Sequence, residues 1–315
     1  MVCACLLLPR RADMDNKQYK QPGKTELFHE DGSSRGFYSA KNKVNDLTGK
    51  EWLFSTRSVI TKPYPLNLRH DLRSQHGAQK PPDLCADIIR TLTKRGQTIL
   101  DPLMGVGGVL LGAALSGRMA TGIEINQKWI GLYKQVCREE GLQELECLCG
   151  DAACVLPTLS ARTYDLVFTD VPYWKMDIAP RSKGRYKKVG EQSRPAPQSK
   201  LNAFGPHYAD KSEWLAKMGR VFALATGLLK DGGYLATFVG DMYFANEYHC
   251  LPAELAYELQ QIEGLLWKAN IIWYDVSKKL HLYGYQYAYI PSLIHQNILV
   301  FRKEGKKKER RNLSF

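Results

Sequence analysis

The sequence predicts an α/β fold in which helices cover both faces of a doubly wound, mostly parallel sheet of seven strands. The main observation is that short apolar strands alternate with helical segments from residue 97 onward, as in chains that build parallel sheets. The composition agrees, because 44% hydrophobic and 24% charged residues are typical of a globular protein. With 315 residues, the chain is also long enough to bury a substantial core.

The predicted strands are short apolar runs, and the predicted helices place apolar residues at helical spacing. The strands are expected at 97–101, 119–125, 145–150, 165–170, 234–240, 268–275 and 297–302. Helices are expected at 108–116, 127–140, 213–229 and 252–262. In the helix at 213–229, for example, Leu215, Met218 and Phe222 fall on one face.

These elements place a single domain at residues 46–303, between two polar ends. Residues 1–45 lack periodicity and predict a flexible polar arm. Residues 304–315 form a basic tail, which is either a solvated end or a nucleic-acid contact. A long basic insertion at 175–212 interrupts the fold, and loops of this length inside a compact domain are usually functional or disordered.

Composition narrows the environment and the partners. The formal net charge of +12 suits a polyanionic partner, although charge alone does not establish one. The apolar run Leu6-Leu7-Leu8 is too short to span a membrane, so we expect a cytoplasmic protein. No CxxC motif occurs, and the spacing of Cys147, Cys149 and Cys154 does not match a zinc site, so we expect no metal.

A glycine-rich turn follows the first strand of the alternating region, in the sequence Asp101-Pro102-Leu103-Met104-Gly105-Val106-Gly107-Gly108. Glycines there let a ligand approach the backbone at a helix N-terminus. At the end of the next strand, Glu124 can accept hydrogen bonds from two ribose hydroxyls. A nicotinamide dinucleotide is disfavoured because Leu110 stands where its fingerprint has glycine. The pattern therefore indicates a nucleoside-containing cofactor, with a purely structural turn as the alternative.

The third strand ends in a second acidic position, within Gly150-Asp151-Ala152. At that edge of a doubly wound sheet a carboxylate faces the ligand crevice, where it can hold an adenine amino group. The candidate cofactor-binding residues from both turns are Asp101, Pro102, Met104, Gly105, Gly107, Glu124, Ile125, Asp151 and Ala152.

The fourth strand ends in the most specific motif, Asp170-Val171-Pro172-Tyr173-Trp174. Here the chain resembles the S-adenosylmethionine-dependent amino-methyltransferases, whose signature is Asp/Asn/Ser-Pro-Pro-Tyr/Phe/Trp. The segment His76-Gly77-Ala78-Gln79-Lys80-Pro81 is similar to the His-Pro-Thr-Gln-Lys-Pro segment of the same enzymes. The resemblance implies a Rossmann-like methyltransferase fold, S-adenosylmethionine as cofactor and Lys80 among the cofactor-binding residues.

The chemistry of this family explains the residue types in the motif. An amine on an aromatic ring is a weak nucleophile, and acceptors for both its N–H groups favour a pyramidal nitrogen. The resemblance implies that Asp170 and the Val171 carbonyl are these acceptors, with Pro172 shaping the turn and Tyr173 stacking on the extruded base. Val171 replaces the first proline of the signature, which loses rigidity but keeps the carbonyl. The alternative is that Asp170 only caps a turn and Tyr173 packs in the core.

The resulting prediction is a site-specific DNA methyltransferase acting on an exocyclic amino group of a flipped base in double-stranded DNA. Asp170 favours adenine N6 over cytosine N4. Target recognition falls to the insertion at 175–212, the N-terminal arm or another chain. The insertion is favoured because its basic residues are interleaved with Tyr186, Phe204, His207 and Tyr208. A restriction nuclease or a specificity subunit is a possible partner, and the oligomeric state stays open. Two alternatives remain: a methyltransferase of tRNA or rRNA bases, and a catalytically impaired nucleic-acid-binding homologue.

Overall fold

The computed structural model describes residues 23–29, 31–161, 163–174, 210–280, 282 and 286–305. Its centre is an eight-stranded sheet with the order β3-β11-β12-β8-β7-β4-β5-β6. In that order the strands are Val59–Ile60, Leu265–Tyr274, His295–Lys303, Leu229–Val239, Tyr164–Asp170, Thr98–Asp101, Met119–Glu124 and Glu146–Cys149. The order reverses beside β4, because β5 and β6 extend to one side and β7 and β8 to the other. This is the doubly wound topology that the alternation predicts.

The strand count and the strand directions differ from the prediction in two details. All seven expected strands are present, and β3 adds an eighth at the edge through two residues paired with β11. Strand β12 runs antiparallel to both of its neighbours, so the sheet is mixed. A two-residue edge strand leaves too little sequence pattern to predict, and the direction of β12 depends on a connection whose described residues contain no helical crossover.

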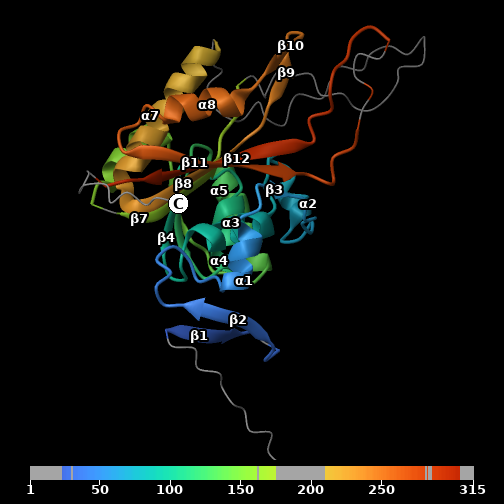
Figure 1. The fold of residues 1–315 in the computed structure, drawn as a ribbon. Coiled ribbons are helices and arrows are strands. Elements are labelled where there is room, and N and C mark those ends of the chain that lie inside the picture. The colour runs from blue at the N-terminus through green and yellow to red at the C-terminus, as the bar shows by residue number, and fades with distance from the viewer. Residues whose placement is uncertain are drawn as a thin grey trace, which may run out of the picture.

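Helices cover both faces of the sheet, as Figure 1 shows. Helices α3 (Pro82–Leu92), α4 (Gly108–Leu115) and α5 (Gln127–Glu139) pack on one face, and α6 (Ala152–Val155), the 3₁₀ turn η1 (Leu156–Leu159), α7 (Lys211–Leu228) and α8 (Leu251–Leu259) pack on the other. Each face has its own buried cluster, with Tyr133 and Phe168 in the first and Trp214 and Phe222 in the second. Helix α3 was not expected, although proline in its first turn is a known start signal.

The N-terminal arm was predicted too long. Residues 1–22 lie outside the described part of the chain, but β1 (Lys24–Phe28) and β2 (Ser34–Ser39) form an antiparallel hairpin. The hairpin is tied to α1 (Gly49–Ser55) because Arg35 makes two hydrogen bonds to Glu51, at 2.9 and 3.1 Å. Thr48 and Glu51 also form a reciprocal capping box at the start of α1. These contacts are tertiary, so local periodicity did not reveal them, although Asp31-Gly32 was a usable turn signal.

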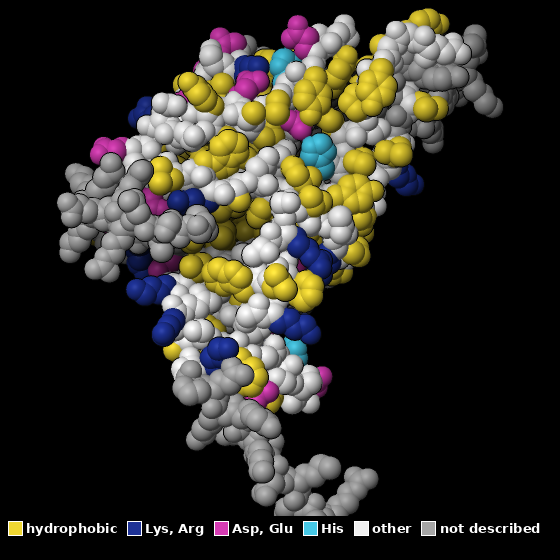
Figure 2. All heavy atoms as spheres, in the orientation of Figure 1, with side chains coloured by type: hydrophobic (Ala, Val, Ile, Leu, Met, Phe, Trp, Pro, Cys, Tyr) yellow, Lys and Arg dark blue, Asp and Glu magenta, His cyan; other side chains and the backbone are white. Residues whose placement is uncertain are grey.

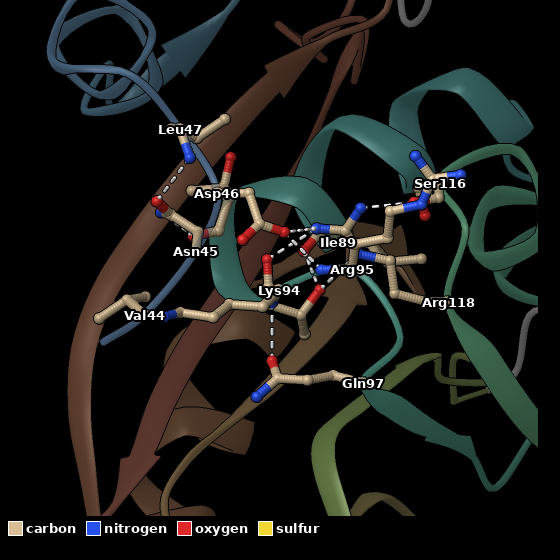
Figure 3. Close-up of polar contacts among 12 residues, drawn as sticks. Val44, Asn45, Asp46, Leu47, Ile89, Lys94, Arg95, Gln97, Ser116 and Arg118 are labelled. Atoms are coloured by element: carbon tan, nitrogen blue, oxygen red, sulfur yellow. Dashed lines mark hydrogen bonds and ion pairs between the residues drawn. The ribbon is translucent and has the colours of Figure 1, made fainter. Parts of the chain in front are cut away.

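A polar network fastens the segment after this hairpin to the amino ends of β4 and β5 (Figure 3). The buried Arg118 donates to the Thr93 carbonyl at 2.8 Å and to Thr93 Oγ1 at 3.2 Å, and it reaches Asp46 at 3.5 Å. Asp46 also accepts from the backbone N–H of Arg95. The network lies at the opposite end of the strands from the predicted site, so it contributes to stability rather than to chemistry.

Three further small elements lie near the carboxyl ends of the strands: α2 (His70–Arg73), β9 (Met242–Phe244) and β10 (Glu247–His249). Of the predicted insertion at 175–212, residues 175–209 lie outside the described residues, and α7 already begins at Lys211. The basic tail beyond residue 305 also lies outside them. Among the helices that the structure describes, none is both long and apolar enough to cross a membrane.

Candidate active site and cofactor site

The glycine loop between β4 and α4 is held open by a carboxylate from the neighbouring strand. Glu124, at the end of β5, accepts from the Gly105 N–H at 3.0 Å and from the Asn126 N–H at 2.8 Å. Gly107 is in the left-handed region (φ 77°), and a Cβ there would lie 2.3 Å from the Tyr133 ring. Only glycine fits this position, because both the backbone conformation and the space exclude a side chain.

Each oxygen of Glu124 keeps a further lone pair, since a carboxylate has about four acceptor sites in all. Glu124 is buried, and burial raises the pKa of its carboxyl. Beside it, the Ile125 side chain is 47% exposed and offers an apolar surface at the rim of the crevice. Glu124 and Ile125, both predicted to bind the cofactor, therefore lie side by side. The carboxylate fits a ribose, and the apolar side chain fits an adjoining planar ring.

Asp101 has a more internal place than the sequence suggested. Its Oδ1 accepts from Thr169 Oγ1 at 2.6 Å and from the Leu103 N–H at 3.2 Å. Burial raises the pKa of its carboxyl to about 7. Pro102 and the Met104 side chain are also buried, which leaves the loop backbone to meet a ligand.

Asp151 is at the predicted strand end, but its carboxylate already has two partners. Oδ1 accepts from the Ala153 N–H at 2.8 Å and caps α6, while Oδ2 lies 3.3 Å from Lys217 Nζ. Ala152 is buried directly behind it. A ligand amino group can still share these oxygens, since neither is saturated.

Asp170 ends β7 and forms an ion pair with Lys80, which comes from the segment before α3. The Lys80 ammonium donates to Asp170 Oδ2 and also lies over the Phe238 ring, 5.2 Å from its centroid. Asp170 Oδ1 is buried and has no hydrogen-bond partner among the described residues. Burial raises the pKa of the Asp170 carboxyl, and the Lys80 charge opposes that rise. The structure thus places the Lys80 head group at the predicted catalytic carboxylate, while the Lys80 backbone packs on Gly108 of the glycine loop.

The departure from the family signature at Val171 has a structural counterpart. Val171 is buried in the core, and its N–H donates to the Phe238 carbonyl at 3.3 Å. Proline has no N–H and could not make this bond. The Pro172 carbonyl accepts from Trp214 Nε1 at 2.7 Å. These two bonds hold the motif in place where the signature would rely on a rigid proline.

Tyr173 stands against Gly240, which follows β8. A Cβ at Gly240 would lie 3.1 Å from Tyr173 Cε2 and 3.2 Å from its hydroxyl. That hydroxyl is buried without a hydrogen-bond partner in the described part of the chain, and burial raises its pKa. Asp241, the next residue, bonds His295 at 3.2 Å between Oδ2 and Nε2. Sequence reasoning missed Gly240, Asp241 and the role of His295, although Gly-Asp after a strand was the signal it used at Asp151.

Trp174, the last residue of the motif, packs edge-on against Phe244 and His249 of the β9–β10 hairpin, at centroid distances of 5.7 and 5.1 Å. Its indole N–H is buried and finds no acceptor within the described ranges. Lys211 lies over the same ring at 5.8 Å. The motif thus continues into an aromatic wall that the sequence did not predict.

A cavity of about 150 Å³ lies on the other side of Lys80. Two aromatic side chains, Tyr64 and Trp273, line it together with Gln79, whose Oε1 is buried without a partner among the described residues. The segment that forms one wall includes Leu68 and Arg69 in left-handed conformations. Strain of this kind persists only where other contacts enforce it. Here the buried Arg73 donates to three nearby carbonyls, those of Asn67, Leu68 and Lys80.

His76 supports the glycine loop from below. It is buried, its Nδ1 lies 3.0 Å from the Ala78 carbonyl oxygen, and its ring packs edge-on against Trp129. Burial lowers its pKa to about 3, so the ring is neutral at physiological pH. This position fits a structural role for His76.

Comparisons with known proteins found similarity to methyltransferases. A family model described as DNA methylase matches residues 11–135. Over 152 residues the chain is 27% identical to tRNA (guanine(10)-N2)-dimethyltransferase from Pyrococcus abyssi, covering 47% of this chain and 42% of that protein. The structure of TrmN from Thermus thermophilus superposes with a TM-score of 0.50 at 16% identity, covering 77% of this chain and 55% of that one. The chain thus spans about half the length of these relatives.

The structural match shows a Rossmann-like methyltransferase fold, and together with the family-model match over residues 11–135 it indicates S-adenosylmethionine as the cofactor. The residues present fit this cofactor, because the loop backbone, the spare lone pairs of Glu124 and the exposed Ile125 offer what an adenosine needs. Within the described ranges, no three His, Cys, Asp or Glu side chains gather in a way that could hold a metal ion.

Proposed function

We propose that this chain transfers a methyl group from S-adenosylmethionine to an exocyclic amino nitrogen of a nucleobase. The observation that carries the proposal is Asp170 Oδ1, a buried carboxylate oxygen without a partner among the described residues, at the strand end next to the glycine loop. A buried acceptor left unsatisfied costs free energy, so a ligand donor there stabilises the site. An amino group is such a donor.

The cofactor supplies an electrophilic methyl group on a sulfonium. The chain's own residues act on the nucleophile: Asp170 Oδ1 and the Val171 carbonyl accept the two N–H bonds and direct the nitrogen lone pair away from the ring plane. Lys80 favours the ionised form of the buried Asp170, since its charge opposes the effect of burial. The raised pKa then favours proton acceptance at Oδ1 once the nitrogen has gained its methyl group.

The target ring is placed by the aromatic residues around this carboxylate. Tyr173 and Trp174 offer stacking surfaces, and the cavity lined by Lys80, Tyr64 and Trp273 offers further space for a planar ring. A base inside a duplex cannot reach such a site without leaving the stack. We therefore propose that the target nucleotide is extruded from the duplex or already unpaired.

For the substrate we propose double-stranded DNA, with adenine N6 favoured over cytosine N4. The match to a DNA methylase family model over residues 11–135 and the aspartate at position 170 support this choice. We propose further that the basic insertion at 175–212 contacts the target and that a nuclease or specificity subunit is a possible partner. The formal charge of +12 is compatible with such polyanionic contacts.

A second candidate is methylation of guanine N2 in tRNA. It is favoured by the similarity to a protein named tRNA (guanine(10)-N2)-dimethyltransferase, which covers 47% of this chain. The described active-site residues serve either amine, because guanine N2 also presents two N–H donors.

The deciding experiment is methyl transfer by the purified chain to unmethylated genomic DNA and to unmodified tRNA, in parallel. The nucleosides are then separated and identified by mass spectrometry. We expect N6-methyl-2′-deoxyadenosine from the DNA reaction. N2-methylguanosine from the tRNA reaction would replace the substrate proposal but keep the chemistry. No methylated nucleoside from either substrate, with the cofactor shown to bind, would refute the proposal.

A further inference from the structure

The connection between β11 and β12 carries an exposed aromatic surface that the proposed chemistry does not use. Tyr287 and Tyr289 are 93% and 91% exposed, and Leu280 and Leu282 are also exposed. We call these four residues, with Lys279, the tyrosine surface. Figure 2 shows hydrophobic side chains gathered on the upper right of the molecule, where β9, β10 and this connection lie in Figure 1. Exposed apolar side chains that gather in one patch often mark an interaction site.

Both ends of the connection lie at the candidate site. Asp275, just after β11, lines the cavity beside Lys80. His295, at the start of β12, bonds Asp241, which directly follows the glycine that packs on Tyr173. A chain bound at Asp170 can therefore continue onto the tyrosine surface without crossing the body of the domain.

The composition of the connection points to the chemistry of its partner. Residues 276–294 contain four tyrosines at alternate positions (283, 285, 287 and 289), two lysines and one histidine, and no aspartate or glutamate. Aromatic rings accompanied only by positive charge suit a polyanion whose own flat rings are available for stacking. A protein partner would more often be met by aliphatic side chains and by charges of both signs.

We propose that the tyrosine surface binds nucleotides that flank the target base and leave the duplex with it, by stacking on Tyr287 and Tyr289. The bases must be unpaired because stacked pairs in a duplex close their ring faces to an outside partner. The inference rests on the proposed function and deepens it, because it says in what form the nucleic acid is held. It also places a nucleic-acid contact on a segment distinct from the basic insertion at 175–212.

The test measures binding directly, by fluorescence anisotropy of a labelled mixed-sequence oligonucleotide of about 15 nucleotides, single-stranded or annealed to its complement. The variant is Tyr287→Ala/Tyr289→Ala, which is not expected to affect folding because both rings are almost fully exposed. The matched control is Tyr257→Ala, since Tyr257 is 71% exposed on α8. A second variant, Tyr287→Phe/Tyr289→Phe, keeps the rings and removes the hydroxyls.

We expect the double alanine variant to bind the single strand at least tenfold more weakly, with the control and the phenylalanine variant within twofold of wild type. Equal binding by the double alanine variant and the wild type would overturn the inference. The inference would also be overturned if the double alanine variant binds the single strand normally but differs from the wild type in association state in sedimentation velocity. The surface would then join two copies of the chain.

Methyl transfer is recorded in the same samples, so the two proposals fail separately. Weaker binding by the double alanine variant, with no methylation by the wild type or any variant, contradicts the proposed function. The role of the tyrosine surface in nucleotide binding is then still supported. Normal methylation and normal binding by that variant contradict the proposed role of the tyrosine surface and leave the proposed function standing.

Discussion

Gly240→Ala should separate catalysis from folding, because the three atoms nearest to a Cβ at this position all belong to the motif residue Tyr173. The new Cβ would lie 3.1 Å from Tyr173 Cε2, 3.2 Å from its hydroxyl oxygen and 3.4 Å from Cζ. The first two distances are below ordinary van der Waals contact, so the ring must move by a few tenths of an ångström. The backbone of Gly240 is not left-handed, so alanine adds no conformational strain there.

The size of the effect follows from that displacement. A misplacement of about 1 Å in a catalytic site can cost about 100-fold in rate, so a shift of roughly half that size should cost about tenfold. Stability should change by less than about 1 kcal/mol, because the ring can move and the unfolded chain loses glycine's extra freedom. We therefore expect kcat/KM for methyl transfer to fall about tenfold while the urea unfolding midpoint stays nearly constant.

Gly131→Ala is the matched control for this experiment. Gly131 lies inside α5, and a Cβ there would meet no atom within 4 Å. The substitution should stabilise the protein by about 0.5–1 kcal/mol through helix propensity and leave kcat/KM unchanged. The reasoning is refuted if Gly240→Ala keeps wild-type kcat/KM, or if its activity falls only in proportion to the folded fraction.

Three further predictions concern the glycine loop, Asp101 and the polar network around Arg118. Gly107→Ala should destabilise the fold by about 3 kcal/mol or more, measured by urea unfolding, because its Cβ would meet the buried Tyr133 ring at 2.3 Å and its φ is 77°; a change below about 1 kcal/mol would show that the loop is not packed as described. Asp101 has its pKa raised from 3.8 to about 7, so the folded state holds more protons than the unfolded state and the free energy of unfolding should fall as pH rises from about 4 to about 7, then level off. Asp101→Asn keeps the acceptor for Thr169 and should remove this contribution, on the order of 4 kcal/mol across that range; identical pH profiles of both proteins in thermal unfolding would contradict the assignment. Arg118→Met should cost about 1–3 kcal/mol in unfolding free energy, because its bonds to Thr93 and Asp46 are lost, and should leave kcat unchanged well below the melting temperature; a loss of kcat with normal stability would mean that the network communicates with the site.

The parts of the site that the sequence could predict are those set by single strand ends. Asp101, Glu124 and Asp170 each close a predicted strand, and parallel strands bring such residues to one edge whatever the rest of the chain does. The glycine loop is likewise a local feature, since a left-handed position such as that of Gly107 favours glycine in any context.

What the sequence did not reveal depends on contacts between distant segments. Lys80 and Asp170 are 90 residues apart, and only the folded chain shows that the Lys80 ammonium meets the Asp170 carboxylate. The cavity beside Lys80 combines Tyr64 with Trp273, from opposite ends of the domain. The β1–β2 hairpin was missed for the same reason, because its stability depends on Glu51 of α1.

The central claim is that Asp170 carries methyl transfer to a nucleobase amine, and its most direct test is transfer from labelled S-adenosylmethionine by the wild type and by Asp170→Ala. Cofactor affinity is measured on both proteins by calorimetry. We expect label in an N-methylated nucleoside with the wild type, and a rate at least 100-fold lower with Asp170→Ala at a cofactor Kd within about threefold, a loss typical of a single preorganised catalytic group. Transfer by Asp170→Ala at a rate near that of the wild type would contradict the claim.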